Sequence, residues 1–168
     1  MKTVRSVFLF CCGLCVCLCC SCADKAPSSA LLSSVMREAD GLPASYLVYY
    51  SGADEDSGHY LDPEHRAALY GEAVDPDALC EDYAILIGQS DLPYEIHILH
   101  ARATSGVPEL LDALRRRKDL LQQRKNLSYR QEAETVLSQA SAYANGRYLF
   151  LLVTGDNDEI RRLISKRI

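Results

Sequence analysis

The spacing of apolar positions changes along this chain, and each change predicts a different element. Residues 81–89 and 94–102 are two apolar runs that bracket the turn sequence SDLP, which predicts an antiparallel β-hairpin. Residues 45–51 and 147–154 are rich in aromatic and aliphatic residues and predict two further strands. The second of these runs follows the pair Asn145-Gly146, which is a strong short-range hairpin signal.

Apolar residues three and four apart predict helices between these strands. A first helix begins near Ser28 or Ser29 and ends before Gly41. A second begins at Asp62 as the N-cap, with proline at the first helical position, and closes at Gly71. The longest helix covers residues 106–125, and a short one closes the chain over 156–168, capped by Asp156 or Asn157. The stripe of the longest helix consists of Leu110, Leu111, Leu114 and Leu121.

The stretch before Asn145-Gly146 carries two conflicting patterns. Ala133, Val136 and Leu137 have helical spacing, whereas the hairpin signal that follows requires a strand. We expect a strand over Val136–Ala144, with a helix as the alternative. The complete order predicts an α+β fold, in which an antiparallel sheet of about four to five strands carries helices mainly on one face.

The N-terminal residues predict a secretion signal. Lys2 and Arg5 precede an uncharged, mostly apolar stretch over residues 7–20, which is too short to span a bilayer as a helix. The stretch ends in Ser21-Cys22, which resembles a bacterial lipobox. The resemblance implies that the sulfur of Cys22 receives a diacylglyceryl group and that cleavage occurs between Ser21 and Cys22. The pattern departs from a typical lipobox at the third position before the cleavage point, where Cys19 stands in place of leucine.

These observations divide the chain into three parts: a lipoprotein signal peptide (1–21), a lipid-anchored tether (22–28) and one α+β domain (29–168). Seven of the eight cysteines precede residue 23, inside or next to the apolar stretch. No companion pair follows them at zinc-site spacing, so we expect no metal site there. A plain signal peptide or an uncleaved anchor is the alternative. The predicted location is the extracytoplasmic side of the cell membrane.

The domain resembles a family of small lipoproteins from Gram-positive, clostridial-type bacteria that carry a domain of unknown function. The similar features, in addition to the lipobox, are Leu69-Tyr70-Gly71 followed by Pro76-Asp77, the hairpin over 81–101, the charged helix over 107–125 and the segment NGRYLFLLV before a final helix. The resemblance implies a location and a fold. It implies no activity and no catalytic residues.

The remaining candidates for chemistry are weak. His97 and His100 fall on a predicted strand and point to opposite faces, so they cannot bind one metal ion together. The acidic stretch Asp54–His65 lacks the glycine and glutamate positions of an EF-hand. Arg115–Lys118 predicts a solvated helix face, with contact to anionic lipid headgroups as the alternative. Cys80 is expected to be a small buried residue with an unreactive thiol.

The sequence therefore predicts a membrane-anchored binding or accessory module at the cell envelope, with an envelope protein or a small molecule as its partner. The chain has 168 residues and a net charge of −5, which argues against nucleic-acid binding. Signal cleavage would change that charge to −7 by removing Lys2 and Arg5. No motif indicates a cofactor or a catalytic residue. The alternatives are a lipid-anchored hydrolase that uses residues from Asp54–His65 and an envelope-stability protein without a small ligand.

Overall fold

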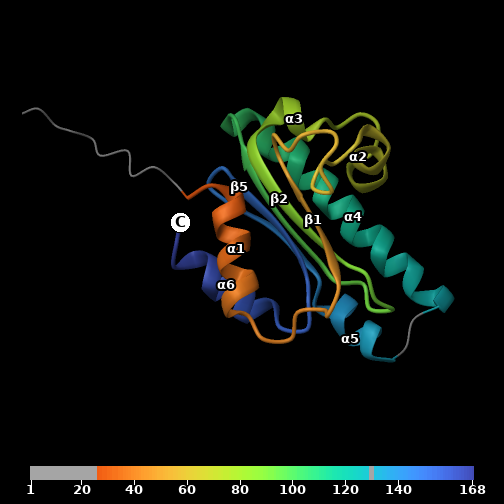
Figure 1. The fold of residues 1–168 in the computed structure, drawn as a ribbon. Helices are drawn as coiled ribbons and strands as arrows, with labels where there is room; N and C mark the ends of the chain where they lie inside the picture. Colours follow the sequence, from red (N-terminus) through yellow and green to blue (C-terminus); the bar gives the residue numbers. More distant parts are fainter. Residues whose placement is uncertain (1–25, 129–130) are drawn as a thin grey trace, which may run out of the picture.

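The computed structural model describes residues 26–128 and 131–168 (Figure 1). A five-stranded antiparallel sheet has the strand order β1-β2-β3-β5-β4. The predicted α+β class and the antiparallel sheet are therefore confirmed. The elements are α1 (Ser28–Glu38), β1 (Tyr46–Tyr50), α2 (Pro63–Tyr70), α3 (Pro76–Leu79), β2 (Cys80–Gly88), β3 (Glu95–Ala101), η1 (Thr104–Gly106), α4 (Val107–Ser128), α5 (Gln131–Gln139), β4 (Ser141–Asn145), β5 (Tyr148–Val153) and α6 (Asn157–Ser165).

Helices cover both faces of the sheet, which corrects the expectation that they lie mainly on one face (Figure 1). On one face α2, α4 and α5 enclose a core that includes Leu114 and Leu149. On the other face α1 and α6 pack on each other and on the sheet, around Leu32 and Phe150. The central strands β3 and β5 are consequently buried at every position.

Capping residues set several helix boundaries, as the sequence predicts. Asp62 accepts a hydrogen bond from the His65 amide at 2.9 Å, and Gly71 ends α2 with a φ of 87°. Asp156 caps α6 by accepting from the Glu159 amide at 2.9 Å. The one-turn helix α3 was not predicted, although Asp75 caps it and Pro76 occupies its first position.

The predicted strand over Val136–Ala144 is wrong in its first half. Helix α5 continues to Gln139, and the strand begins only at Ser141. Val136 and Leu137 are buried on the α4 side of the sheet, and the amide of Gln122 in α4 donates to the Leu137 carbonyl at 2.9 Å. The same carbonyl also accepts from the Ala140 amide at 3.3 Å, so the Gln122 bond adds a link between the end of α5 and α4. Packing on α4 therefore decides between the two patterns.

Within the described residues, no helix combines the length and the apolar composition that crossing a bilayer requires.

Candidate functional site

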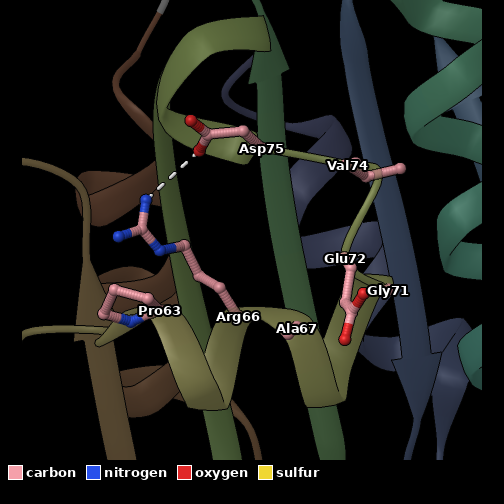
Figure 2. Close-up of a pocket in the computed structure, with 7 residues that line it drawn as sticks. All are labelled: Pro63, Arg66, Ala67, Gly71, Glu72, Val74 and Asp75. Carbon is pink, nitrogen blue, oxygen red and sulfur yellow. Dashed lines mark hydrogen bonds and ion pairs between the residues drawn. The ribbon is translucent and has the colours of Figure 1, made fainter.

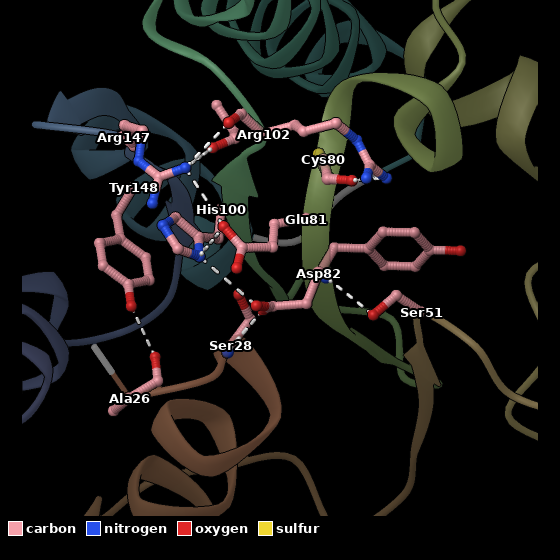
Figure 3. A network of polar contacts seen from close by, with 12 residues as sticks. Ala26, Ser28, Ser51, Cys80, Glu81, Asp82, His100, Arg102, Arg147 and Tyr148 are labelled. Atoms are coloured by element: carbon pink, nitrogen blue, oxygen red, sulfur yellow. Dashed lines mark hydrogen bonds and ion pairs between the residues drawn. The ribbon is translucent and has the colours of Figure 1, made fainter. Parts of the chain in front are cut away.

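A cluster of polar residues fixes the start of the described chain to the end of the sheet (Figure 3). The hydroxyl of Tyr148 donates to the Ala26 carbonyl at 2.6 Å, and the amide of Ser28 donates to Asp82 Oδ1 at 2.7 Å. Burial, followed by the nearby charge of Asp82, raises the pKa of Tyr148, so its hydroxyl keeps the proton that it donates. The chain is thus held from Ala26 onward, immediately before α1.

His100 lies at the centre of this cluster. Its ring stacks on Tyr148 with the centroids 4.3 Å apart and an angle of 10° between the planes. The Nδ1 atom lies 3.5 Å from Asp82 Oδ2 and 3.7 Å from Glu81 Oε2. The ring is buried, and within the described part of the chain Nε2 has no hydrogen-bond partner. The cluster therefore holds an imidazole between two carboxylates and an aromatic ring.

Arg147 joins three strands at the same end of the sheet (Figure 3). Its Nη1 atom donates to Glu81 Oε2 at 3.2 Å and to the carbonyls of Ala101 and Arg102 at 3.1 and 2.9 Å. Arg102 in turn donates to the Cys80 carbonyl at 2.8 Å. These bonds use carbonyls at the ends of β2 and β3. The arrangement positions the chain start relative to the sheet.

A second network lies in the core between β3 and α4. Arg117 forms two parallel hydrogen bonds with Glu95, from Nε to Oε2 at 3.0 Å and from Nη2 to Oε1 at 2.5 Å. His97 Nε2 lies 3.1 Å from the same Oε2 atom, and His97 Nδ1 lies 2.8 Å from the Tyr70 hydroxyl. Because a carboxylate only accepts, the Nε2 atom of His97 carries a proton and donates a hydrogen bond to Glu95. All four side chains are buried.

The Glu95 network gives the protein an acid-sensitive component of stability. Burial raises the pKa of Glu95, but hydrogen bonds from His97 and Arg117 outweigh burial and lower that pKa from 4.5 to about 2. The unfolded chain therefore binds more protons than the native state between these values, and stability falls as the pH falls through them. Denaturant unfolding of the wild type and of Glu95→Gln at several pH values checks this prediction. The decrease in the free energy of unfolding at low pH should be smaller in Glu95→Gln than in the wild type. An equal decrease in the two proteins would contradict the assignment to Glu95.

This network was not predicted from the sequence, although charged residues at otherwise apolar positions indicated it. Arg117 occurs in the apolar stripe of the long helix, three residues after Leu114 and four before Leu121. Glu95 likewise interrupts a strand that is otherwise mostly apolar. A charged residue in an apolar stripe predicts a buried partner, but the two residues are separated by 22 positions, so no local spacing connects them.

A shallow hollow of about 250 Å³ lies between α2 and α3 (Figure 2). Arg66 lines it and is ion-paired with Asp75 at 3.2 Å and with Asp77. The guanidinium thus joins α2 to α3, and its charge is already matched by two carboxylates. The ion pairs beside the hollow therefore hold α2 and α3 together, which is a structural role.

A larger hollow of about 430 Å³ lies beside the loop after β1. Asp54 and His59 line it together with Tyr50, which places part of the predicted Asp54–His65 candidate there. His59 Nδ1 lies 2.8 Å from the Val48 carbonyl, so the ring donates from Nδ1 and its Nε2 atom carries the lone pair. His65 instead pairs with Asp62 at 2.6 Å on the surface of α2.

The four histidines thus contact four different sets of residues. His97 and His100 face opposite sides of the sheet, as predicted, since one contacts Tyr70 and the other stacks on Tyr148. No group of three or more potential metal-binding side chains occurs within residues 26–128 and 131–168. The arrangement does not bring the histidines of the Asp54–His65 segment together with those of β3, which is what a hydrolase built from distant loops would require.

Two predictions concern cysteines. Cys80 is buried, with only 2% of its surface exposed, as expected from the sequence. Burial, and then the charge of Asp82, raise the pKa of its thiol to about 12, so the thiolate is scarce near neutral pH. The predicted lipidation residue Cys22 and the preceding Ser21 lie outside the described residues.

Comparisons of the chain with protein-family models, with curated proteins and with solved structures gave no match.

Proposed function

We propose that this protein is an extracytoplasmic lipoprotein, anchored to the cell membrane through Cys22, whose domain acts as a binding or accessory module at the cell envelope. The observation that carries the proposal is the position of Ser21-Cys22 at the end of an uncharged apolar stretch. Within the described part of the chain, the first residue that is hydrogen-bonded to the sheet is Ala26, four positions after Cys22. A signal and a short tether directly before a folded domain are the arrangement that lipid anchoring requires.

The non-enzymatic part of the proposal is supported by the polar clusters. The His100 cluster is occupied in holding the chain start, and the Glu95 network is enclosed in the core. The partner is proposed to be an envelope protein or a small molecule, and the hollow lined by Tyr50, Asp54 and His59 is a candidate surface for the latter. Its volume of about 430 Å³ lies within the usual range of small-ligand sites.

The intact mass of the N-terminal peptide from membrane-extracted protein tests the anchor. We expect a peptide that begins at Cys22 and carries a diacylglyceryl mass, with residues 1–21 removed. Cys22→Ala should lack this mass and leave the membrane fraction or remain uncleaved. Cys20→Ala is the matched control, since Cys20 belongs to the predicted signal peptide. A wild-type protein that retains all seven N-terminal cysteines without a lipid would contradict the proposal.

A further inference from the structure

The charged side chains of this protein are distributed unevenly between its two helical layers. The segment from Asp54 to Asp77 contains eight acidic side chains and a single arginine, Arg66, which gives it a net charge of −7. From Leu61 onward the segment lies on the α4 side of the sheet, because its apolar residues belong to the core there. These residues are Leu61, Leu69, Tyr70 and Val74. The loop before Leu61 lies beside the start of α1, since Asp54 and Ser29 line the same hollow.

The opposite layer, formed by α1 and α6, carries exposed cations. In α6, Arg162 and Lys166 are four residues apart and therefore share one side of the helix, opposite the buried Ile160, Leu163 and Ile164. In α1, the side chain of Arg37 is 69% exposed. Acidic side chains lie close to each arginine of this layer. Glu38 is 3.9 Å from Arg37 and also pairs with Arg167, Asp158 is 3.5 Å from Arg161, and Glu159 is 3.8 Å from Arg162. Residues 26–40 and 156–168 together therefore carry no net charge, compared with −7 for the acidic segment. From residue 161 to residue 168 there are four cations and no acidic side chain.

The tether enters the molecule in this same layer. Ala26 is held by Tyr148 directly before α1, and α1 packs on α6 (Figure 1). If Cys22 carries the lipid, four peptide steps limit the distance from the anchor to Ala26 to about 14 Å. The outer surface of α1 and α6 is therefore close to the bilayer, whereas the part of the acidic segment from Leu61 onward lies beyond the sheet.

We propose that the outer face of α1 and α6 is the docking surface of the domain on a bilayer that contains anionic lipids. Arg162 and Lys166, together with Arg37, contact the headgroup phosphates, and the acidic layer faces away from the membrane. Each lysine or arginine near such a surface strengthens the contact about fivefold. This proposal rests on the proposed lipid anchor. It replaces Arg115–Lys118 as the expected membrane contact, because those residues belong to α4 on the other face of the sheet.

Depth-dependent quenching of a thiol-attached fluorophore tests the orientation. The acylated protein is reconstituted into phosphatidylcholine vesicles with or without phosphatidylglycerol, with a quencher on the headgroup. One label is placed by Ser165→Cys on the outer side of α6, and the other by Ala73→Cys in the acidic layer; both positions are exposed. Labelling is selective, since Cys80 is buried and the thioether at Cys22 has no free thiol.

We expect several-fold stronger quenching at position 165 than at position 73 in vesicles that contain phosphatidylglycerol. The difference should be smaller at high salt, because salt shortens the range of the attraction between the protein and the lipid charges. Arg162→Glu combined with Lys166→Glu should abolish the difference. Arg115→Glu combined with Arg116→Glu is the matched control, since both arginines are exposed on α4, and it should leave the difference unchanged.

Equal quenching at positions 165 and 73 in the wild type would overturn the docking surface. So would an α4 control variant that loses the difference in quenching as completely as the α6 variant does. The mass of the N-terminal peptide from the same preparation separates the two proposals. A lipid on Cys22 with equal quenching overturns only the orientation, whereas a missing lipid overturns the anchor and, with it, the premise of the orientation.

Discussion

Replacing Glu95 by glutamine is expected to destabilise the protein by about 3–5 kcal/mol. Glutamine has nearly the same shape but no charge, so the buried Arg117 loses the carboxylate to which it donates two hydrogen bonds. The cost arises mainly from the loss of this charged partner, since the Coulomb gain of a buried pair is largely offset by the desolvation of both groups. Urea unfolding at neutral pH measures the change in free energy.

An exposed ion pair provides the matched control for Glu95→Gln. Arg115 and Asp112 lie 3.2 Å apart on α4, but both side chains are more than half exposed. Asp112→Asn should therefore cost less than about 1 kcal/mol. The double variant Glu95→Gln with Arg117→Met should recover part of this loss of stability, because it also removes the buried guanidinium that Glu95 neutralises. Equal effects of Glu95→Gln and Asp112→Asn would show that the buried pair is not what stabilises β3 against α4.

The second large effect is expected from α1. Leu32→Ala should destabilise the domain by about 2–5 kcal/mol, which is as much as Leu114→Ala in α4. Both leucines have no exposed surface, and they lie on opposite faces of the sheet. Each truncation removes favourable contacts and leaves a cavity that neighbouring side chains fill only in part. Thermal or denaturant unfolding measures both changes.

This comparison tests the two-sided core directly. If α1 were a peripheral helix and the sheet had one principal covered face, Leu32→Ala would resemble a surface substitution. Leu120→Ala supplies that reference, since Leu120 is 47% exposed and its loss should change stability by about 0.5 kcal/mol or less. A Leu32→Ala value near the Leu120→Ala value would contradict the architecture described for α1 and α6.

Local sequence determined most of the elements of this protein. The strands over 81–89, 94–102 and 147–154 are found at β2, β3 and β5, and Asp62 and Asp156 cap helices as expected. These features depend on residues a few positions apart: a side-chain oxygen that meets a free amide, or an Asn-Gly pair that reverses the chain. Such contacts depend only on the conformation of the segment itself, and they can therefore be recognised without knowledge of the fold.

The number of covered faces could also be inferred from the sequence, although we predicted one principal face. Strand β5 has the sequence YLFLLV, which is apolar at every position, and all six residues are buried. A strand with one solvated face alternates between apolar and polar residues, whereas a strand covered on both sides does not. The mostly apolar sequences of β3 and β5 thus indicated helices on both sides of the sheet.

Only the tertiary structure decided which distant residues meet. Strand β5 lies between β3 and β4, so that His100 and Tyr148 are neighbours on adjacent strands. Asp82 of β2 accepts a hydrogen bond from Ser28 at the start of α1. Likewise, α5 continues past Val136 because its buried side faces α4, against the local strand signal. These outcomes depend on the free energy of burying and pairing segments that lie far apart in the chain. A local sequence pattern gives no information about such distant contacts. The sequence alone therefore determined most of the elements and predicted the anchor, while the packing on the sheet decided the extent of α5 and which residues form the polar clusters.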